Sequence, residues 1–327
     1  MIKFAVIGTN WITQKFVQAA HEVSAMQLTA VYSRNLESAV AFGEEFGVTT
    51  HYTNLDDLAN DQTIDAVYIA SPNSFHCQQA ITLMEHNKHV ICEKPVASNL
   101  HEAQQMFAIA EKHNVVLFEA YKSQYLPNFQ AVQQALPKIG KIHKAHISYC
   151  QYSSRYQRYL DGENPNTFNP AFSNGSLIDI GFYSVAAAVA LFGKPEKVQA
   201  SAHLLESGVD GHGSAIFRYP DYDVTLAHSK VSDSYAYSEI QGELGAILID
   251  HIAECTHVKI QYRNGEVEEL SQPQRDNSMC YEAEMFAQVL KGNSEAQLQA
   301  QQRALTVSEL ITEMRRQVGV HYPADEL

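Results

Sequence analysis

The first 120 residues alternate short apolar runs with longer stretches of helical periodicity. The apolar runs predict buried strands at residues 3–7, 28–33, 66–70, 89–92 and 115–118. The helical stretches between them predict helices at residues 12–21, 36–46, 74–86 and 100–113. Strands that alternate with helices in this way predict a doubly wound parallel sheet of the Rossmann type, in a domain of residues 1–120.

From about residue 140 the pattern changes to longer runs in which apolar and polar positions alternate. These runs predict strands at residues 141–153, 197–204, 214–219, 223–231, 235–241, 246–251 and 258–262. Turn sequences such as Asn264-Gly265 join neighbouring runs as hairpins. Helical periodicity returns at residues 127–136, 178–192, 280–291 and 299–317. We therefore expect residues 121–327 to form an α+β domain with a large, mostly antiparallel open sheet.

The second sheet also bears on assembly. If its helices cover one face only, we expect Tyr, Ile, Val and Leu side chains on the other face to form a large exposed apolar patch. A homodimer or homotetramer built through this sheet would cover such a patch. The second domain is thus expected to serve both substrate binding and oligomerisation.

The composition is that of a soluble globular protein, with 45% hydrophobic residues and a net charge of −14. The negative charge argues against binding to nucleic acid or to anionic membranes, because both require a basic surface. We find no apolar run of the ~18 residues that a membrane span needs, and the first residues lead directly into a strand. We expect a cytoplasmic protein whose partner is a small molecule.

Cysteine and histidine give no sign of a metal centre. The five cysteines are odd in number and widely spaced, and none lies in a C-x-x-C motif, which favours reduced thiols over a disulfide framework. The 15 histidines form neither H-x-x-x-H nor H-E-x-x-H. We predict no metal site.

The first candidate site is the turn from Gly8 to Thr13, between the first predicted strand and helix. A dinucleotide fingerprint would place G-x-G-x-x-G here, yet only Gly8 of the three glycines is present. Asn10 tolerates a positive φ better than most residues and Thr13 is small, so the turn can still hold a pyrophosphate. An ordinary strand-to-helix turn is the alternative.

The second predicted strand is followed by Ser33 and Arg34. A Rossmann domain specific for NAD usually places an acid here for the ribose 2′-hydroxyl, whereas a hydroxyl and a guanidinium suit a 2′-phosphate. This pair favours NADP over NAD. The alternative is a solvated arginine in a surface loop.

Two further loops follow predicted strands of the same sheet. Residues 70–76 read ASPNSFH, and residues 88–95 read KHVICEKP. Ligands of such folds bind at the carboxyl ends of the strands, so both loops are candidates for the cofactor site. Pro95 directly follows Lys94, so this lysine is positioned rather than mobile.

In combination, these motifs resemble the Gfo/Idh/MocA (glucose-fructose oxidoreductase, inositol dehydrogenase and dihydrodiol dehydrogenase-like) family. The resemblance rests on AVIG at 5–8, SPN-x-x-H at 71–76, KHVICEKP at 88–95, EAY at 119–121 and D-x-G-x-Y at 179–183. It implies an enzyme, a dehydrogenase or reductase that uses NADP or NAD to act on CH–OH groups. It also implies a carbohydrate-like substrate, such as a sugar, a polyol, an inositol or a related cyclic diol.

The resemblance implies roles for individual residues as well. Lys94 matches the family's EKP lysine, which contacts the nicotinamide side of the site and the substrate hydroxyl, and Asp179 and Tyr183 match the acid and proton-handling residue of a second-domain helix. Many relatives carry histidine where Tyr183 stands. Whether Lys94 or Tyr183 is the immediate proton partner is left open. The residues expected at the cofactor are Gly8, Thr9, Asn10, Trp11, Ile12, Ser33, Arg34, Ser71, Pro72, Asn73, His76, Glu93, Lys94 and Pro95.

Two other functions compete with a dehydrogenase. Some proteins similar to this family are glycosidases that keep the nicotinamide bound and break a glycosidic bond by transient oxidation. A non-catalytic NAD(P)-binding sensor is the second alternative, against which the set of Lys94, Asp179 and Tyr183 argues. The sequence does not identify the substrate, its stereochemistry or the physiological direction of the reaction.

Overall fold

A computed structural model describes residues 1–326, and their contacts divide the chain into two compact units. The first unit contains Met1–Tyr121 and Arg275–Leu305, and the second contains Lys122–Gln274 and the chain from Thr306 onward. The sequence predicted two continuous domains, 1–120 and 121–327. The structure differs from this prediction because residues 275–305 belong to the first unit. The physical basis of this difference is the packing of helix α9 (Met279–Leu290) against α1 (Trp11–Glu22).

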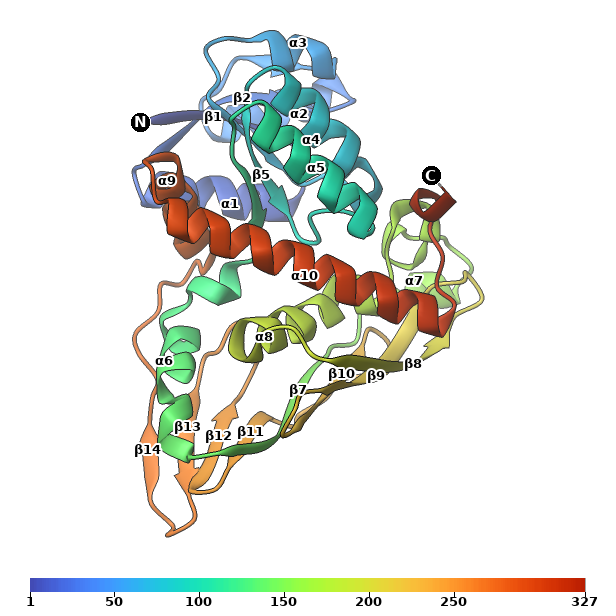
Figure 1. Cartoon of the computed structure of the whole chain (residues 1–327). Coiled ribbons are helices and arrows are strands. Elements are labelled where there is room, and N and C mark those ends of the chain that lie inside the picture. Colours follow the sequence, from blue (N-terminus) through green and yellow to red (C-terminus); the bar gives the residue numbers. More distant parts are fainter. Residues whose placement is uncertain (327) are drawn as a thin grey trace. The chain divides into compact units, whose positions relative to one another are not determined.

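The first unit is built on a parallel sheet of six strands (Figure 1). In chain order these are β1 (Ile2–Ile7), β2 (Met26–Tyr32), β3 (His51–Tyr52), β4 (Ala66–Ile69), β5 (His89–Glu93) and β6 (Leu117–Ala120). Their order in the sheet is β3-β2-β1-β4-β5-β6, which confirms the doubly wound Rossmann-type fold. The strand order reverses between β1 and β4, and this is the point at which such sheets bind ligands.

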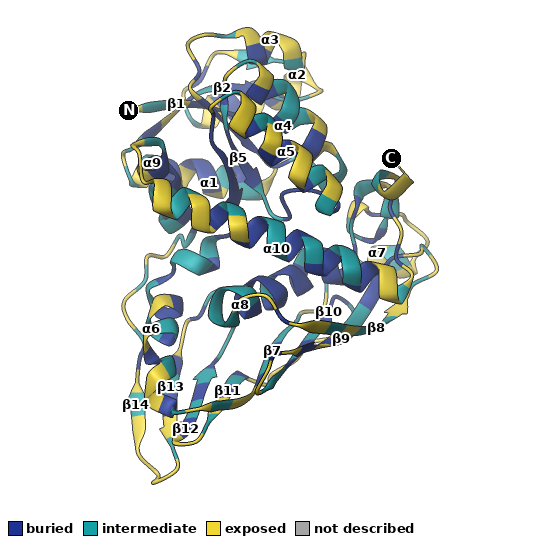
Figure 2. Ribbon diagram, in the orientation of Figure 1, coloured by how far each residue is buried: buried dark blue, intermediate teal, exposed yellow. Residues whose placement is uncertain are grey.

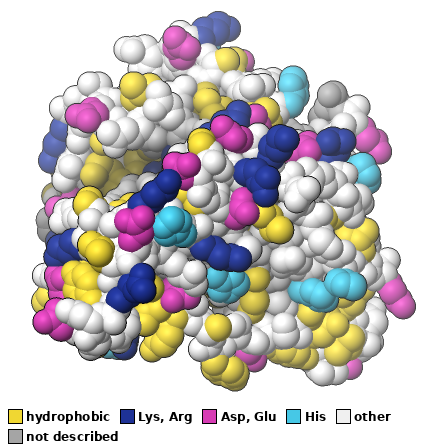
Figure 3. Space-filling view, turned by 60° about the horizontal axis from the view of Figure 1, so that its bottom comes forward, with side chains coloured by type: hydrophobic (Ala, Val, Ile, Leu, Met, Phe, Trp, Pro, Cys, Tyr) yellow, Lys and Arg dark blue, Asp and Glu magenta, His cyan; other side chains and the backbone are white. Residues whose placement is uncertain are grey.

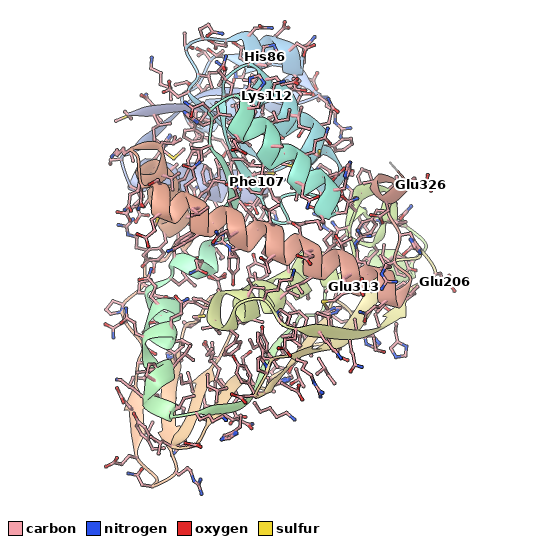
Figure 4. All side chains as sticks on the ribbon, in the orientation of Figure 1. His86, Phe107, Lys112, Glu206, Glu313 and Glu326 are labelled. Carbon is pink, nitrogen blue, oxygen red and sulfur yellow. The ribbon has the colours of Figure 1, made fainter. Side chains whose placement is uncertain are left out.

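Helices bury the sheet of the first unit, and Figure 2 shows its central strands as buried. Besides α1 and α9 they are α2 (Leu36–Glu45), α3 (Leu55–Asn60), α4 (His76–Glu85), α5 (Leu100–Lys112) and the first part of α10 (Ser294–Val318). Phe107 of α5, labelled in Figure 4, belongs to a core cluster with Val67, Ile69 and Val90 of the sheet. The predicted helices are present, whereas the two-residue β3 and the short α3 were too brief to give a periodic signal.

The second unit is built on an eight-stranded sheet with the order β14-β13-β12-β11-β7-β10-β9-β8. The strands are β7 (Ile142–Cys150), β8 (Lys197–Leu204), β9 (Asp210–Arg218), β10 (Asp223–Ser229), β11 (Ser238–Gly242), β12 (Gly245–Ile249), β13 (Val258–Tyr262) and β14 (Val267–Glu269). Only the β7–β10 pair is parallel among the strand pairs of this sheet, which confirms the predicted, mostly antiparallel arrangement.

One face of this sheet is covered by helix α8 (Phe182–Phe192), which packs on β7 and β10 (Figure 1). The other helices of this unit are α6 (Pro127–Ala135), α7 (Tyr156–Leu160) and the second part of α10. The stretch Pro170–Phe192 is long and apolar enough to cross a membrane. We expected no such stretch, because polar residues such as Asp179 interrupt its apolar run. However, 67% of its most apolar 18-residue window is buried inside the protein, as in a core helix.

The opposite face of the sheet is polar. Strand alternation places Lys144, His146 and Ser148 of β7 on it, opposite Asp223, Thr225 and Ala227 of β10. Figure 3, in which the lower side of Figure 1 comes forward, shows charged and histidine side chains among hydrophobic ones. The expected apolar patch is therefore wrong. Single branched side chains such as Ile216 of β9, which lies opposite Thr225 and is 41% exposed, occur among the polar ones.

Candidate functional site

The turn between β1 and α1 requires the one glycine that it retains. Gly8 has a φ of +101°, which side chains rarely tolerate. A Cβ atom at this position would also lie 2.8 Å from the carbonyl oxygen of Ala70, at the end of β4. Gly8 thus lets the turn approach the end of the neighbouring strand at the switch point of the sheet.

Asn10 replaces the second fingerprint glycine in an unexpected way. Its φ is −92°, so the positive φ that we expected is wrong. Asn10 instead caps α1: its Oδ1 atom accepts hydrogen bonds from the amides of Ile12 (3.0 Å) and Thr13 (3.2 Å). Its Nδ2 atom donates to the carbonyl of Ala70 at 3.0 Å. One side chain therefore fixes the start of the helix and joins it to β4.

The same turn keeps donors that suit an anion. The amides of Thr9 and Trp11 have no hydrogen-bond partner within residues 1–326. Unpaired amides at the start of a helix attract phosphate, and the partial positive charge of the helix end adds to the attraction. Trp11 is 63% exposed, and the Lys15 amine lies 5.5 Å from its ring centre. The residues present thus fit a dinucleotide pyrophosphate.

Ser33 and Arg34 lie in the loop after β2, where neighbouring groups hold the backbone. The Ser33 amide donates to the carbonyl of Tyr52 at 3.1 Å, and Asn35 caps α2 by accepting from the Ser38 amide at 3.0 Å. Arg34 is exposed, and its guanidinium carbon lies 5.8 Å from the ring centre of Phe75. The loops after β2 and β4 therefore meet, although the sequence analysis did not include Phe75 in the site.

The loop after β4 contains Ser71, Pro72 and Asn73, and Asn73 opens the single turn η1 (Asn73–Phe75). His76, predicted at the cofactor, is fully buried. Its two ring nitrogens each lie 2.9 Å from a carbonyl oxygen, that of Ser71 and that of Pro95. Burial lowers the pKa of His76. We therefore interpret His76 as a clamp that joins the loops after β4 and β5, not as a direct cofactor ligand.

Glu93, Lys94 and Pro95 end β5 and begin its loop. The Tyr68 hydroxyl donates to Glu93 at 2.5 Å, and the Val96 amide donates to Glu119 of β6 at 3.0 Å. Glu119 is buried, and burial raises its pKa. Lys94 is half-buried between these anchors. The sequence analysis used Glu119 only as part of a motif, but its carboxylate is what holds the chain directly after Lys94 and Pro95.

In the second unit, Asp179 lies in a π-helical turn, Leu177–Gly181, that leads into α8. Wider π-helical turns are often found at functional sites. Asp179 forms an ion pair with Lys230, which also donates a hydrogen bond to Thr167. Lys230 was missed by the sequence analysis because it follows β10, 51 residues beyond Asp179, and belongs to no motif.

The π-helical turn is attached to the sheet at two further points. The Leu177 amide donates to Asp210 of β9 at 2.6 Å, and Ser176 shares a hydrogen bond of 2.9 Å with His228 of β10. Gly181 lies directly against the His228 ring, because a Cβ atom there would approach the ring to 3.0 Å. Burial raises the pKa of Asp210 to about 6 and lowers the pKa of His228 to about 3.

Tyr183 is the second residue of α8, four positions beyond Asp179. Its ring centre lies 5.6 Å from that of Tyr149, and the Tyr149 ring lies 4.6 Å from His251. Burial lowers the pKa of His251, although Glu254 and Asp250 oppose the shift. The second unit thus contains Asp179 and Tyr183 with a row of aromatic rings beside them.

Two family models match the chain. The model described as an oxidoreductase family with an NAD-binding Rossmann fold matches residues 2–121, and that of the GFO/IDH/MocA C-terminal domain matches residues 129–248. Among curated proteins, the chain is 55% identical to the uncharacterized oxidoreductase YgjR of Escherichia coli, over 100% of this chain and 99% of that protein. It is 46% identical to IolU of Bacillus subtilis, named scyllo-inositol 2-dehydrogenase (NADP(+)), over 100% of both. Among solved structures, the 3-ketoreductase KijD10 of Actinomadura kijaniata, in complex with NADP and TDP-benzene, is similar with a TM-score of 0.84 and 22% identity, over 97% of this chain and 98% of that one.

Proposed function

Because the chain belongs to the GFO/IDH/MocA family of oxidoreductases, we propose that it is an NADP-dependent dehydrogenase of a cyclic polyol, with scyllo-inositol as the first candidate substrate. The observation that carries this proposal is the 46% identity, along the full length of both chains, to a scyllo-inositol 2-dehydrogenase that uses NADP. Other inositols, sugars and cyclic diols belong to the same substrate class, and NAD is the alternative cofactor.

The first unit supplies the proposed cofactor site. The amides of Thr9 and Trp11 bind the pyrophosphate at the start of α1, with Gly8 allowing the close approach. Ser33 and Arg34 bind the 2′-phosphate, because a guanidinium makes strong, charge-assisted hydrogen bonds to phosphate oxygens. The remaining predicted residues of this site, from Ser71 to Pro95, hold the two loops on which the nicotinamide end depends.

The chemistry requires a hydride acceptor and groups that handle the hydroxyl proton. The nicotinamide, when bound, accepts the hydride from the substrate carbon. Lys94 and Tyr183 bind the reacting hydroxyl and take up its proton, and Asp179 orients the substrate by accepting a hydrogen bond. The proposal covers either Lys94 or Tyr183 as the immediate proton partner.

The experiment that tests this proposal is a substrate screen with the purified protein. Inositols, sugars, diols and chromogenic glycosides are each offered with NAD and with NADP, and turnover is read from the absorbance of the reduced nicotinamide. We expect turnover of scyllo-inositol or a close relative with NADP. Release of an aglycone without net nicotinamide reduction would favour the glycosidase, and cofactor binding without turnover on any compound would favour the sensor.

We also propose a cytoplasmic location and a homodimer or homotetramer. All five cysteines are free, four of them buried, as expected for a protein kept in a reducing compartment. An assembly through the second sheet would use its polar face, on which Lys144 and Asp223 lie side by side. Its contacts would therefore be mainly hydrogen bonds and ion pairs between rows of strand residues.

A further inference from the structure

The ion pair between Lys230 and Asp179 joins a buried group to an accessible one. Only 6% of the Lys230 side chain is exposed, against 32% of the Asp179 side chain. The lysine therefore lies behind the carboxylate, inside the second unit, while the carboxylate reaches the surface of that unit. A lysine in this place is suited to act on the carboxylate rather than directly on a ligand.

Lys230 is itself held firmly at both ends. Its amide donates to the carbonyl of Gly211 at 2.9 Å, and its own carbonyl accepts from the Ser153 amide at 2.9 Å. At the other end, its amine bonds Thr167 as well as Asp179 and lies 5.6 Å from the centre of the buried Phe168 ring. A long side chain that is fixed in this way loses little further freedom when it holds a partner.

The ion pair with Lys230 is a contact of the Asp179 side chain itself, whereas the other attachments of the π-helical turn involve its neighbours. The attachments through Leu177 and Ser176 precede Asp179 and fix the backbone, but they do not fix the direction of the carboxylate. The ion pair engages Oδ2 of Asp179 and so sets the rotation of the carboxyl group. We propose that Lys230 is a positioning residue for the reaction, which orients Asp179 so that its carboxylate accepts the hydrogen bond of the substrate.

This inference rests on the proposed function, in which Asp179 binds substrate. It predicts that loss of Lys230 acts through Asp179 and lowers the rate of the bound complex more than it weakens cofactor binding. Without its cation the Asp179 carboxylate would turn towards other donors, and misorientation by a fraction of an ångström slows an otherwise intact site.

The test is a mutant cycle in the full chain, with scyllo-inositol and NADP as substrates. The variants are Lys230→Met, Lys230→Arg, Asp179→Asn and the double variant Lys230→Met/Asp179→Asn. Lys194→Met serves as the matched control, since Lys194 forms an exposed ion pair of 2.6 Å with Glu309 in the same unit. Thermal unfolding of each variant establishes that it is folded.

We expect Lys230→Met to lower kcat by ~10- to 100-fold while the Kd for NADP changes by less than ~3-fold. Lys230→Arg should recover at least part of the rate, and Lys194→Met should change nothing. In the Asp179→Asn background, Lys230→Met should lower kcat by less than ~3-fold, because the effects of two residues that act together are not additive. Should Lys230→Met fail to fold, the rate of Lys230→Arg and of Thr167→Val, relative to Lys194→Met, takes its place.

Four results would count against these proposals, at three different levels. A wild-type kcat for Lys230→Met would overturn the positioning role while leaving the proposed function intact. The same conclusion would follow if the loss of kcat in the double variant equalled the product of the losses in the two single variants. A wild-type rate for Asp179→Asn would remove Asp179 from the proposed site and Lys230 with it. Absence of turnover by the unmutated protein on the whole panel would overturn the proposed function itself.

Discussion

Replacement of Arg34 by alanine tests how the cofactor is chosen. The side chain is exposed, and its guanidinium carbon lies 5.8 Å from the centre of the Phe75 ring. The backbone around it depends on other groups, namely the Ser33 amide bond to Tyr52 and the Asn35 cap of α2. Arg34→Ala should therefore remove a guanidinium without collapsing the loop.

The expected magnitude follows from the interaction that is lost. A hydrogen bond to a charged group contributes about 1.5–3 kcal/mol, and each 1.4 kcal/mol corresponds to about tenfold in affinity. Arg34→Ala should therefore weaken NADP binding about 10- to 100-fold. NAD, which lacks the 2′-phosphate, should change by less than ~3-fold. The exposed contact of Arg34 with Phe75 contributes about 0.5–1 kcal/mol to the free protein. Its loss affects the binding of NADP and NAD equally, so it does not change the difference between their affinities.

Equilibrium titration with NADP and with NAD, at one fixed ionic strength, measures both affinities. Constant salt matters because exposed charges are screened. Arg34→Lys keeps the charge but not the forked geometry of the guanidinium, so its affinity for NADP should lie between those of wild type and Arg34→Ala. Arg263→Ala, in the turn after β13, is the control and should bind as wild type does. Equal losses for NADP and NAD, or no loss for either, would refute the assignment of Arg34 to the 2′-phosphate.

Three further predictions concern stability and assembly. Asn10→Ala loses a helix cap and a hydrogen bond to Ala70, so its free energy of unfolding should fall by about 1–3 kcal/mol. The control Asn54→Ala loses only the cap of α3 and should be less destabilised. Equal losses of the two variants in denaturant titrations would contradict this prediction. Between about pH 4 and 6, Asp210 is protonated in the folded protein but ionised in the unfolded chain. The stability that this proton contributes is therefore lost as pH rises through that range. Asp210→Asn should therefore gain stability relative to wild type from about pH 4 to 6. His228 stays neutral in the folded protein, so His228→Gln should gain stability relative to wild type as pH falls from about 6.5 to 3. If the free energy of unfolding of either variant changed with pH in parallel with that of wild type, these pKa shifts would be wrong. Light scattering at micromolar concentration should give at least a dimer, and a monomeric mass would exclude the assembly.

Much of the fold could be predicted from periodicity alone. The strands of the first unit and the alternation in the second are long, regular signals, and the structure confirms both sheets. The family models confirm the family and its oxidoreductase class, which the motifs around Lys94 and Asp179 had indicated. The placement of residues 275–305 in the first unit was not predictable, because an amphipathic helix does not encode which core it will cover.

The details of the site show a similar limit. Asn10 was expected to imitate glycine, yet capping fixes it at a negative φ, since its side chain finds three partners at once. His76 carries a motif but serves the packing of two loops. Lys230 has no motif and is brought to Asp179 only by the tertiary fold. Local sequence thus supplied the candidate groups of the proposed site, whereas the partners of each group depend on strands that are distant in the chain.

The proposed role of Lys94 is to handle the hydroxyl proton during hydride transfer to the nicotinamide. Lys94→Met keeps most of the side-chain volume and removes the charge, so the decisive measurement is its kcat on the best substrate of the screen, together with its Kd for NADP. We expect kcat to fall by ~100-fold or more while the Kd changes by no more than ~10-fold. A Lys94→Met variant with near-wild-type turnover would contradict the proposed site.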